Sequence, residues 1–104
     1  MNQKTSTQHL DKDQIIAILR KNKNVLEQQF GVTKIALFGS YARGEATETS
    51  DIDLLIESKD NSFDNRCNLK DYLESHLKKP VDLGYFDTLR TFIKQMIEKE
   101  ILYV

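Results

Sequence analysis

The stretch from Ile35 to Ile56 limits what this chain can fold into more than any other, because it combines two strand patterns with a glycine-serine turn. It reads IALFGSYARGEATETSDIDLLI. The apolar run that ends at Phe38 has the length and composition of a buried strand. Gly39 follows where the backbone must turn sharply. If a helix begins at Ser40, its first N–H groups have no internal partner, and such an end attracts phosphate.

The second half of the stretch places two acids on one side of a strand. Side chains in a strand alternate between faces, so Asp51 and Asp53 point the same way, with Cα atoms roughly 6 to 7 Å apart. Ile52, Leu54 and Ile56 fall on the opposite face and can anchor the strand in a core. Two carboxylates this close repel each other unless a cation lies between them. The pair therefore predicts a magnesium site.

Two other motifs share part of this spacing, and each fails at a required position. Gly39 to Gly44 has the glycine spacing of a P-loop, but Glu45 follows where that loop needs lysine. The acid pair could open an EF-hand calcium loop, yet Ile56 stands where the loop needs glycine and Ser62 where it needs glutamate. Neither motif explains the stretch.

The segment resembles the signature of the nucleotidyltransferase superfamily that includes DNA polymerase beta, namely Gly-Ser, a spacer and Asp-x-Asp. It is most similar to the single-domain branch called minimal nucleotidyltransferases. Their motifs Gly-Ser-x-Ala-Arg-Gly and Ser-Asp-x-Asp-Leu correspond to Gly39–Gly44 and Ser50–Leu54. The family carries a third metal carboxylate on a later strand. The resemblance assigns it to Asp82, which lies between Val81 and Leu83.

The resemblance implies an enzyme that transfers AMP from ATP with two Mg²⁺ ions. The expected catalytic acids, which are also the expected metal ligands, are Asp51, Asp53 and Asp82. The expected nucleotide-binding residues are Gly39, Ser40 and Arg43.

Several of these residues also allow a purely structural interpretation. An acid inside a strand, such as Asp82, can simply face solvent. Gly39 and Ser40 can form an ordinary strand-to-helix turn with a serine cap, which is compatible with phosphate binding because both use the same amides. Arg43 either reaches the triphosphate or only braces the loop that carries Glu45 and Glu48.

The resemblance also implies a partner, because no domain that could hold an acceptor is visible. Minimal nucleotidyltransferases typically act as antitoxins beside an all-helical HEPN toxin, and some transfer AMP to a tyrosine hydroxyl of that toxin. The alternative is a non-catalytic antitoxin that occludes its partner, with the apolar tail Ile101 to Val104 and the last helix as its contact surface. Transfer to a small molecule such as an aminoglycoside is disfavoured, because no substrate domain is visible.

Composition excludes several other classes of protein. Residues 1–34 carry six basic and three acidic groups, whereas residues 35–60 carry two and six, so acidity is concentrated at the motif. A binder of nucleic acid needs a basic face, so no direct nucleic-acid contact is expected. No apolar run is long enough for a membrane span or a signal peptide, which predicts a cytoplasmic protein. Cys67 is the single cysteine, and no zinc-ligand spacing is present.

The periodicity of apolar residues predicts an α/β (α+β) fold in which helices pack on one face of a small sheet. We expect residues 1–10 to be disordered and residues 11–104 to form a single domain. The expected strands are 34–38, 51–57 and 81–85, and the expected helical segments are a stripe over 11–30, a turn over 40–43, a helix over 63–77 and a last helix after Asp87. The order of the strands cannot be read from the pattern. The resemblance implies a mixed sheet of three to four strands, with the acids on its open face.

Overall fold

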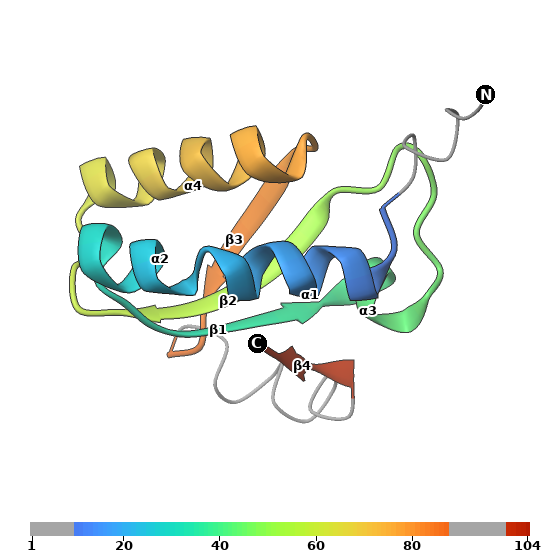
Figure 1. Ribbon diagram of the computed structural model, residues 1–104, viewed down its shortest axis with the longest axis horizontal. Helices are drawn as coiled ribbons and strands as arrows, with labels where there is room; N and C mark the ends of the chain where they lie inside the picture. The colour runs from blue at the N-terminus through green and yellow to red at the C-terminus, as the bar shows by residue number, and fades with distance from the viewer. Residues whose placement is uncertain (1–9, 88–99) are drawn as a thin grey trace.

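In the computed structural model, which describes residues 10–87 and 100–104, three helices cover one face of a four-stranded sheet (Figure 1). A fourth, short helix lies at one end of the sheet (Figure 1). The helices are α1 (Lys12–Lys21), α2 (Lys23–Phe30), α3 (Gly39–Arg43) and α4 (Phe63–Leu77), and the strands are β1 (Val32–Phe38), β2 (Ile52–Ser58), β3 (Val81–Tyr85) and β4 (Leu102–Tyr103). The predictions for residues 1–9 and for the last helix, with its apolar stripe over 89–97, lie outside the described residues.

The predicted helical stripe over residues 11–30 forms two helices rather than one. It begins with a capping box, in which the Gln14 amide N–H donates to the Asp11 carboxylate at 2.8 Å. The stripe divides at Asn22, whose side chain donates to the Ile18 carbonyl at 2.8 Å and accepts from the Tyr72 hydroxyl at 2.6 Å. These two bonds fix the break. The apolar positions still face inward on both sides of it.

The boundaries of α4 and β3 agree with the prediction. The Ser62 side chain accepts from the Asn65 N–H at 3.2 Å and caps the start of α4. The helix ends at Leu77 and is followed by Lys78, which has a left-handed φ of 61° and lies two residues before Pro80. The strand β2 starts one residue later than predicted, so Asp51 immediately precedes it. No helix in the described part of the chain is long and apolar enough to cross a membrane.

The sheet is mixed, as expected, and has the strand order β3-β2-β1-β4. The central strands β1 and β2 are antiparallel, β2 and β3 are parallel, and β4 is antiparallel to β1. The predicted apolar tail supplies β4, in which Leu102 pairs with Leu37 and Tyr103 with Ala36. The Lys23 ammonium also donates to the Val104 carbonyl at 2.9 Å. The end of the chain is therefore part of the sheet.

The hydrophobic core lies between the sheet and the covering helices. Ile52, Leu54 and Ile56 of β2 are each 0 % exposed on this face, as predicted. Seven apolar residues of the covering helices also belong to the hydrophobic cluster. They are Ile15, Leu19, Leu26 and Phe30 on the first two helices, and Leu69, Leu73 and Leu77 on α4.

The other face of the sheet carries the acids at one end and aromatic side chains at the other. The centre of this face is buried. Ala36 and Leu55, which pair there, are 0 % and 1 % exposed. Beyond them the rings of Phe86 and Tyr103 stack at 5.9 Å, and the Lys34 ammonium lies 5.0 Å from the Phe86 ring. The acids thus lie on the predicted face, but only part of that face is open.

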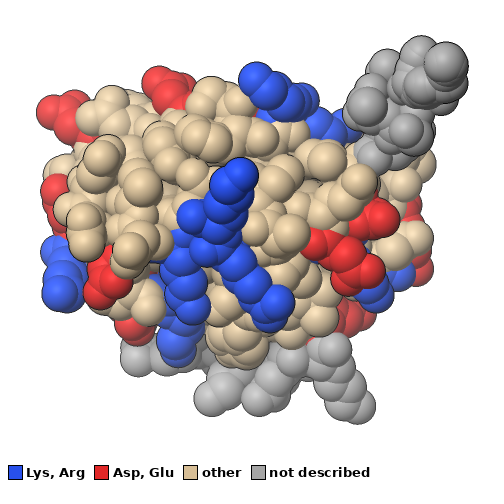
Figure 2. Space-filling model, in the orientation of Figure 1, with Lys and Arg blue, Asp and Glu red and all other residues tan. Residues whose placement is uncertain are grey.

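Charge is separated across the molecule, as its distribution along the sequence suggests. Lys and Arg side chains gather over the junction of α1 and α2 (Figure 2). Arg20, Lys21 and Lys23 are exposed there. The acids that were predicted to act in catalysis come instead from β2, β3 and the loop before β2.

Candidate active site

Asp53 and Asp82 are held side by side by the register of two parallel strands. Asp53 on β2 is the direct partner of Asp82 on β3. Paired residues point to the same face, and neighbouring strands lie about 4.8 Å apart. The preceding pair, Ile52 and Val81, points into the core with at most 3 % exposure. A slip of one residue would bury the acids and expose the apolar pair, so core packing fixes the two carboxylates together.

Gly39 lies directly against Asp53. Phe38 is the partner of Asp53 on β1, so the chain leaves β1 beside this carboxylate. Gly39 has a left-handed φ of 78°, and an added Cβ would overlap the Asp53 carboxylate and lie 3.1 Å from the Asp53 Cβ. Position 39 therefore needs glycine for two reasons, namely backbone conformation and space. The sequence predicted the turn but not the contact.

The short helix α3 forms where it was expected, immediately after this turn. No side chain caps its start, and it ends at Gly44, which has a φ of 75°. The Ser40 carbonyl accepts from the Glu45 N–H at 2.9 Å and closes the following loop. The start of α3 consequently lies next to Asp53. Binding of nucleotide phosphate by Gly39 and Ser40 stays a prediction.

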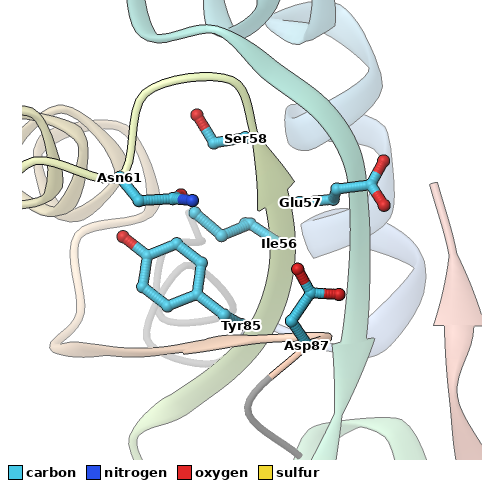
Figure 3. Close-up of a pocket in the computed structure, with 6 residues that line it drawn as sticks. All are labelled: Ile56, Glu57, Ser58, Asn61, Tyr85 and Asp87. Carbon is cyan, nitrogen blue, oxygen red and sulfur yellow. The ribbon is translucent and has the colours of Figure 1, made fainter. Parts of the chain in front are cut away.

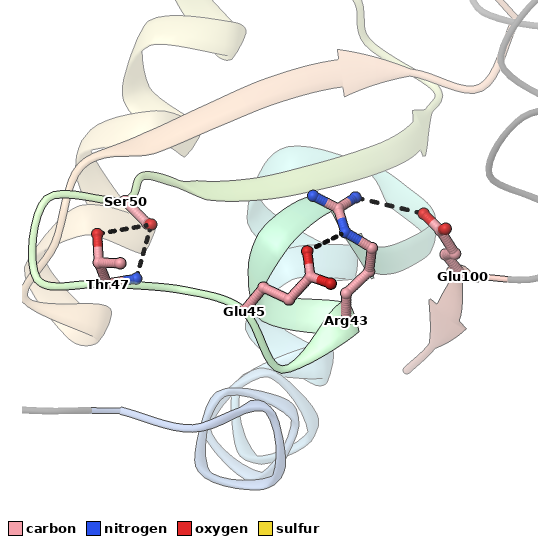
Figure 4. Close-up of polar contacts among 5 residues, drawn as sticks. All are labelled: Arg43, Glu45, Thr47, Ser50 and Glu100. Carbon is pink, nitrogen blue, oxygen red and sulfur yellow. Dashed lines mark hydrogen bonds and ion pairs between the residues drawn. The ribbon is translucent and has the colours of Figure 1, made fainter.

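The loop before Asp51 is held by its own hydrogen bonds (Figure 4). The Thr47 amide N–H donates to the Ser50 hydroxyl at 2.9 Å, and the Ser50 N–H donates back to the Thr47 carbonyl at 3.1 Å. The Lys79 ammonium donates to the Glu48 carbonyl at 2.8 Å and connects this loop to the segment before β3. Asp51 therefore enters β2 from an ordered turn.

Like charges gather around Asp53. Burial raises the pKa of the Asp53 carboxyl, and the negative charges of Asp82 and Asp51 raise this pKa further, while the charge of Arg43 opposes them. Asp51 and Asp82 are exposed. Within residues 10–87 and 100–104, none of the three carboxylates accepts a hydrogen bond or forms an ion pair. A cation among them would relieve the repulsion.

The three acids suit magnesium in their chemistry but do not form a coordination shell by themselves. Carboxylate oxygens are the ligands that Mg²⁺ prefers. As the side chains lie, however, no three His, Cys, Asp or Glu residues of the described chain form a group that could hold a metal ion. The structure brings Asp51, Asp53 and Asp82 to one end of the sheet, and their roles as ligands stay predictions.

Arg43 lies at the end of α3 and pairs with two glutamates (Figure 4). Its Nε–H donates to Glu45 at 2.9 Å, and an Nη1–H donates to Glu100 at 3.3 Å. The contact with Glu45 matches the bracing role considered for Arg43. Contact with a phosphate remains a prediction. Glu100 was not identified from the sequence, because the two residues are 57 positions apart and no local pattern relates them.

A pocket of about 170 Å³ lies away from these acids, at the carboxyl ends of β2 and β3 (Figure 3). Asp53 and Asp82 lie near the opposite ends of the same strands. None of the predicted site residues lines the pocket. Its lining residues are Ile56, Glu57, Ser58, Asn61, Tyr85 and Asp87.

Comparisons with known proteins agree with this geometry. Residues 19–104 match the family model of the nucleotidyltransferase domain. A candidate protein adenylyltransferase of Methanocaldococcus jannaschii is 44% identical over 95 residues, which are 88% of this chain and 95% of the relative. The protein adenylyltransferase MntA of Thermococcus cleftensis is 39% identical over 93 residues, which are 88% of this chain and 94% of the relative.

The fold of this chain is also similar to solved structures. A candidate minimal nucleotidyltransferase superposes on this chain with a TM-score of 0.72 at 30% sequence identity. The superposition covers 90% of this chain and 96% of the chain of that structure. A toxin-antitoxin complex with AMP-PNP has a TM-score of 0.63 at 29% identity, with coverage of 90% and 72%. The MNT antitoxin in complex with a tri-AMPylated HEPN toxin of Shewanella oneidensis has a TM-score of 0.54 at 28% identity, with coverage of 92% and 70%. With the Gly-Ser turn and the paired acids in place, the chain belongs to the nucleotidyltransferase domain family and is an enzyme of its minimal nucleotidyltransferase branch.

Proposed function

We propose that this chain is a magnesium-dependent protein adenylyltransferase that transfers AMP from ATP to a tyrosine hydroxyl of a HEPN-type toxin and so acts as its antitoxin in the cytoplasm. The observation that best supports the proposal is the pairing of Asp53 with Asp82 beside the Gly39 turn. The similarity to an antitoxin bound to a tri-AMPylated HEPN toxin supports the choice of partner and reaction. The similarity to a toxin-antitoxin complex with AMP-PNP supports an adenine nucleotide as substrate.

Each part of the site has a task in this reaction. The N–H groups at the start of α3 and the Ser40 hydroxyl would bind the β- and γ-phosphates, because they can donate hydrogen bonds to phosphate oxygens. Gly39 lets this turn pass close to Asp53. Asp51, Asp53 and Asp82 would hold two magnesium ions, which supply positive charge to the entering and leaving oxygens of an in-line displacement.

The transfer is a substitution at the α-phosphorus of ATP. The tyrosine hydroxyl releases its proton to water, and its oxygen forms a bond to the α-phosphorus. The bond from this phosphorus to the oxygen that bridges to the β-phosphate breaks, and pyrophosphate leaves. The chain's own contribution is to orient the triphosphate at the start of α3 and to fix Asp53 on β2 and Asp82 on β3, with Asp51 directly before β2, so that the acceptor approaches in line.

Mass spectrometry of the partner tests the proposal. The purified chain is incubated with ATP, Mg²⁺ and a HEPN-type helical protein, for which the neighbouring reading frame is the first place to look. The partner should gain the mass of one or more AMP groups, and a variant in which the acceptor tyrosine is phenylalanine should not. The Asp53→Asn chain serves as the inactive control. An unchanged mass under conditions in which toxicity is suppressed would exclude the modifying role.

A second experiment, in cells, separates AMP transfer from neutralisation by occlusion. The apolar tail was the sequence basis for occlusion, and in the structure it pairs with β1 as β4. In cells that express the toxin, Asp53→Asn should abolish protection if AMP transfer is the mechanism. Full protection by that variant would favour occlusion instead.

A further inference from the structure

Arg43 is held from two directions at the acidic end of the sheet (Figure 4). Glu45, two residues along the chain, accepts from Nε at 2.9 Å. Glu100, which lies just before β4, accepts from Nη1 at 3.3 Å. The two carboxylates therefore use different nitrogens of one guanidinium group and approach it from separate parts of the chain.

These contacts leave part of the guanidinium available. The group carries five N–H donors in a rigid planar fork. Within the described residues, Nη2 has no partner, and Figure 4 shows it pointing away from both glutamates. The charge of Arg43 also acts on Asp53, where it opposes the larger effects of burial, Asp82 and Asp51 that raise the pKa of this carboxyl. Arg43 lies four residues after Gly39 on the short helix α3, which starts against Asp53. A guanidinium fork matches two oxygens of a phosphate.

Of the two carboxylates, Glu100 is the more firmly anchored. Its side chain is 36% exposed, whereas that of Glu45 is 66% exposed on the loop after α3. The segment that follows Glu100 is fixed by the pairing of Leu102 with Leu37 on β1. The bond between the Lys23 ammonium and the Val104 carbonyl fixes it further. A carboxylate on this segment can define where the guanidinium lies.

We infer that Glu100 is a positioning residue for Arg43, and that its carboxylate orients the guanidinium so that the remaining N–H groups face the phosphates of the bound nucleotide. The inference rests on the proposed function. It makes the C-terminal segment part of the nucleotide site, although the segment contributes none of the three acids. It also gives the ion pair a role beyond stability, since exposed ion pairs contribute little to folding.

Kinetics of Glu100→Gln test the inference. AMP transfer to the HEPN-type partner is measured at varied ATP concentration. We expect kcat/KM for ATP to fall roughly tenfold, mainly through a higher KM, which is the lower end of the loss found when a partner that orients a metal ligand is removed. Glu100→Asp should recover part of the loss. Glu27→Gln removes the same charge from an exposed position on α2 and should leave both constants and the melting temperature unchanged.

A double-mutant cycle identifies the route of the effect. If Glu100 acts through Arg43, then Glu100→Gln should cause no further loss in an Arg43→Gln background. Additive losses, or wild-type kinetics in Glu100→Gln, would overturn the inference while leaving the proposed function intact. A wild-type chain that transfers no AMP would instead overturn the proposed function, and the inference with it. Equal melting temperatures for Glu100→Gln and wild type would exclude a merely structural role for any kinetic loss observed.

Discussion

Asp53 and Asp82 are paired on adjacent parallel strands, so two like charges project side by side from a sheet whose other face is hydrophobic core. The core makes this arrangement obligatory, because the apolar residues on either side of each acid are buried. Folding therefore imposes an electrostatic cost at this end of the sheet, and a cation can remove it. This relationship leads to the first two predictions.

Replacing Asp53 by asparagine should not destabilise the metal-free protein at neutral pH. Burial and the neighbouring acids raise the pKa of Asp53 above its ordinary value of 3.8, so the folded state binds this proton more tightly than the unfolded state. Stability then falls as pH rises from about 3.8 through the folded-state pKa, and the loss is complete above it. The side-chain amide of the variant cannot ionise and avoids this loss. Urea unfolding of both proteins in EDTA, across a pH series, measures the difference.

In that series the stability of the wild type relative to Asp53→Asn should be greatest at the lowest pH and smallest at neutral pH. A difference independent of pH would contradict the raised pKa. Asp60→Asn is a useful comparison, because hydrogen bonds from Ser62 lower the pKa of Asp60, so its pH dependence should have the opposite sign.

Magnesium together with AMP-PNP should raise the melting temperature of the wild-type chain. A ligand that binds only the folded state at a hundred times its Kd adds about 2.7 kcal/mol to the free energy of unfolding. Asp53→Asn should lose most of this shift, because it removes a carboxylate from the centre of the acid cluster. Glu27→Gln should keep it. Differential scanning fluorimetry measures the shift, and equal shifts in wild type and Asp53→Asn would argue against the acids as the magnesium site.

Gly39→Ala should impair activity more than stability, and Gly44→Ala is its matched control. Both glycines have a left-handed φ, so each substitution should cost about 1 to 2 kcal/mol from backbone strain. An added Cβ at Gly44 meets nothing within 4 Å, whereas one at Gly39 overlaps the Asp53 carboxylate. Asp53 must then rotate away from its place beside Asp82.

Unfolding curves and AMP-transfer rates for the two alanine variants distinguish the effect of backbone strain, which both share, from the overlap with Asp53, which only Gly39→Ala has. We expect Gly44→Ala to retain most of its activity and Gly39→Ala to lose it. The stability lost in Gly39→Ala should be partly restored by adding Asp53→Ala, which removes the overlapping carboxylate. No restoration would mean that the contact between these two residues is unimportant.

The parts of the fold that local sequence signals specify were predicted well. Ser62 caps α4 and Pro80 follows its end, so both boundaries could be read directly from the chain. The strand β4 is only two residues long, too short to show a period, and its pairing with β1 is a tertiary effect. The break at Asn22 was hidden because the apolar positions stay on one face across it.

The candidate site likewise combines residues that local sequence motifs predict with residues that only tertiary structure brings together. Gly39, Asp51 and Asp53 belong to one local motif, and its spacing, read together with the family resemblance, was enough to predict them as site residues. The position of Asp82 beside Asp53 depends on strand register, for which the sequence offers only a resemblance to other proteins. Glu100 could not be identified at all, because its contact with Arg43 joins distant parts of the chain.

Tyr72→Phe tests the hydrogen bond that fixes the break between α1 and α2. The Tyr72 hydroxyl donates to the partly buried Asn22 side chain at 2.6 Å, and its removal should lower the free energy of unfolding by about 1 kcal/mol. Tyr103→Phe removes a hydroxyl from an exposed ring and should have almost no effect. Asn22→Ala also loses the bond to the Ile18 carbonyl, so it should cost more than Tyr72→Phe. The double variant should lose less than the sum of the two single losses, because they share one bond. Fully additive losses in urea unfolding would indicate that the two side chains do not interact.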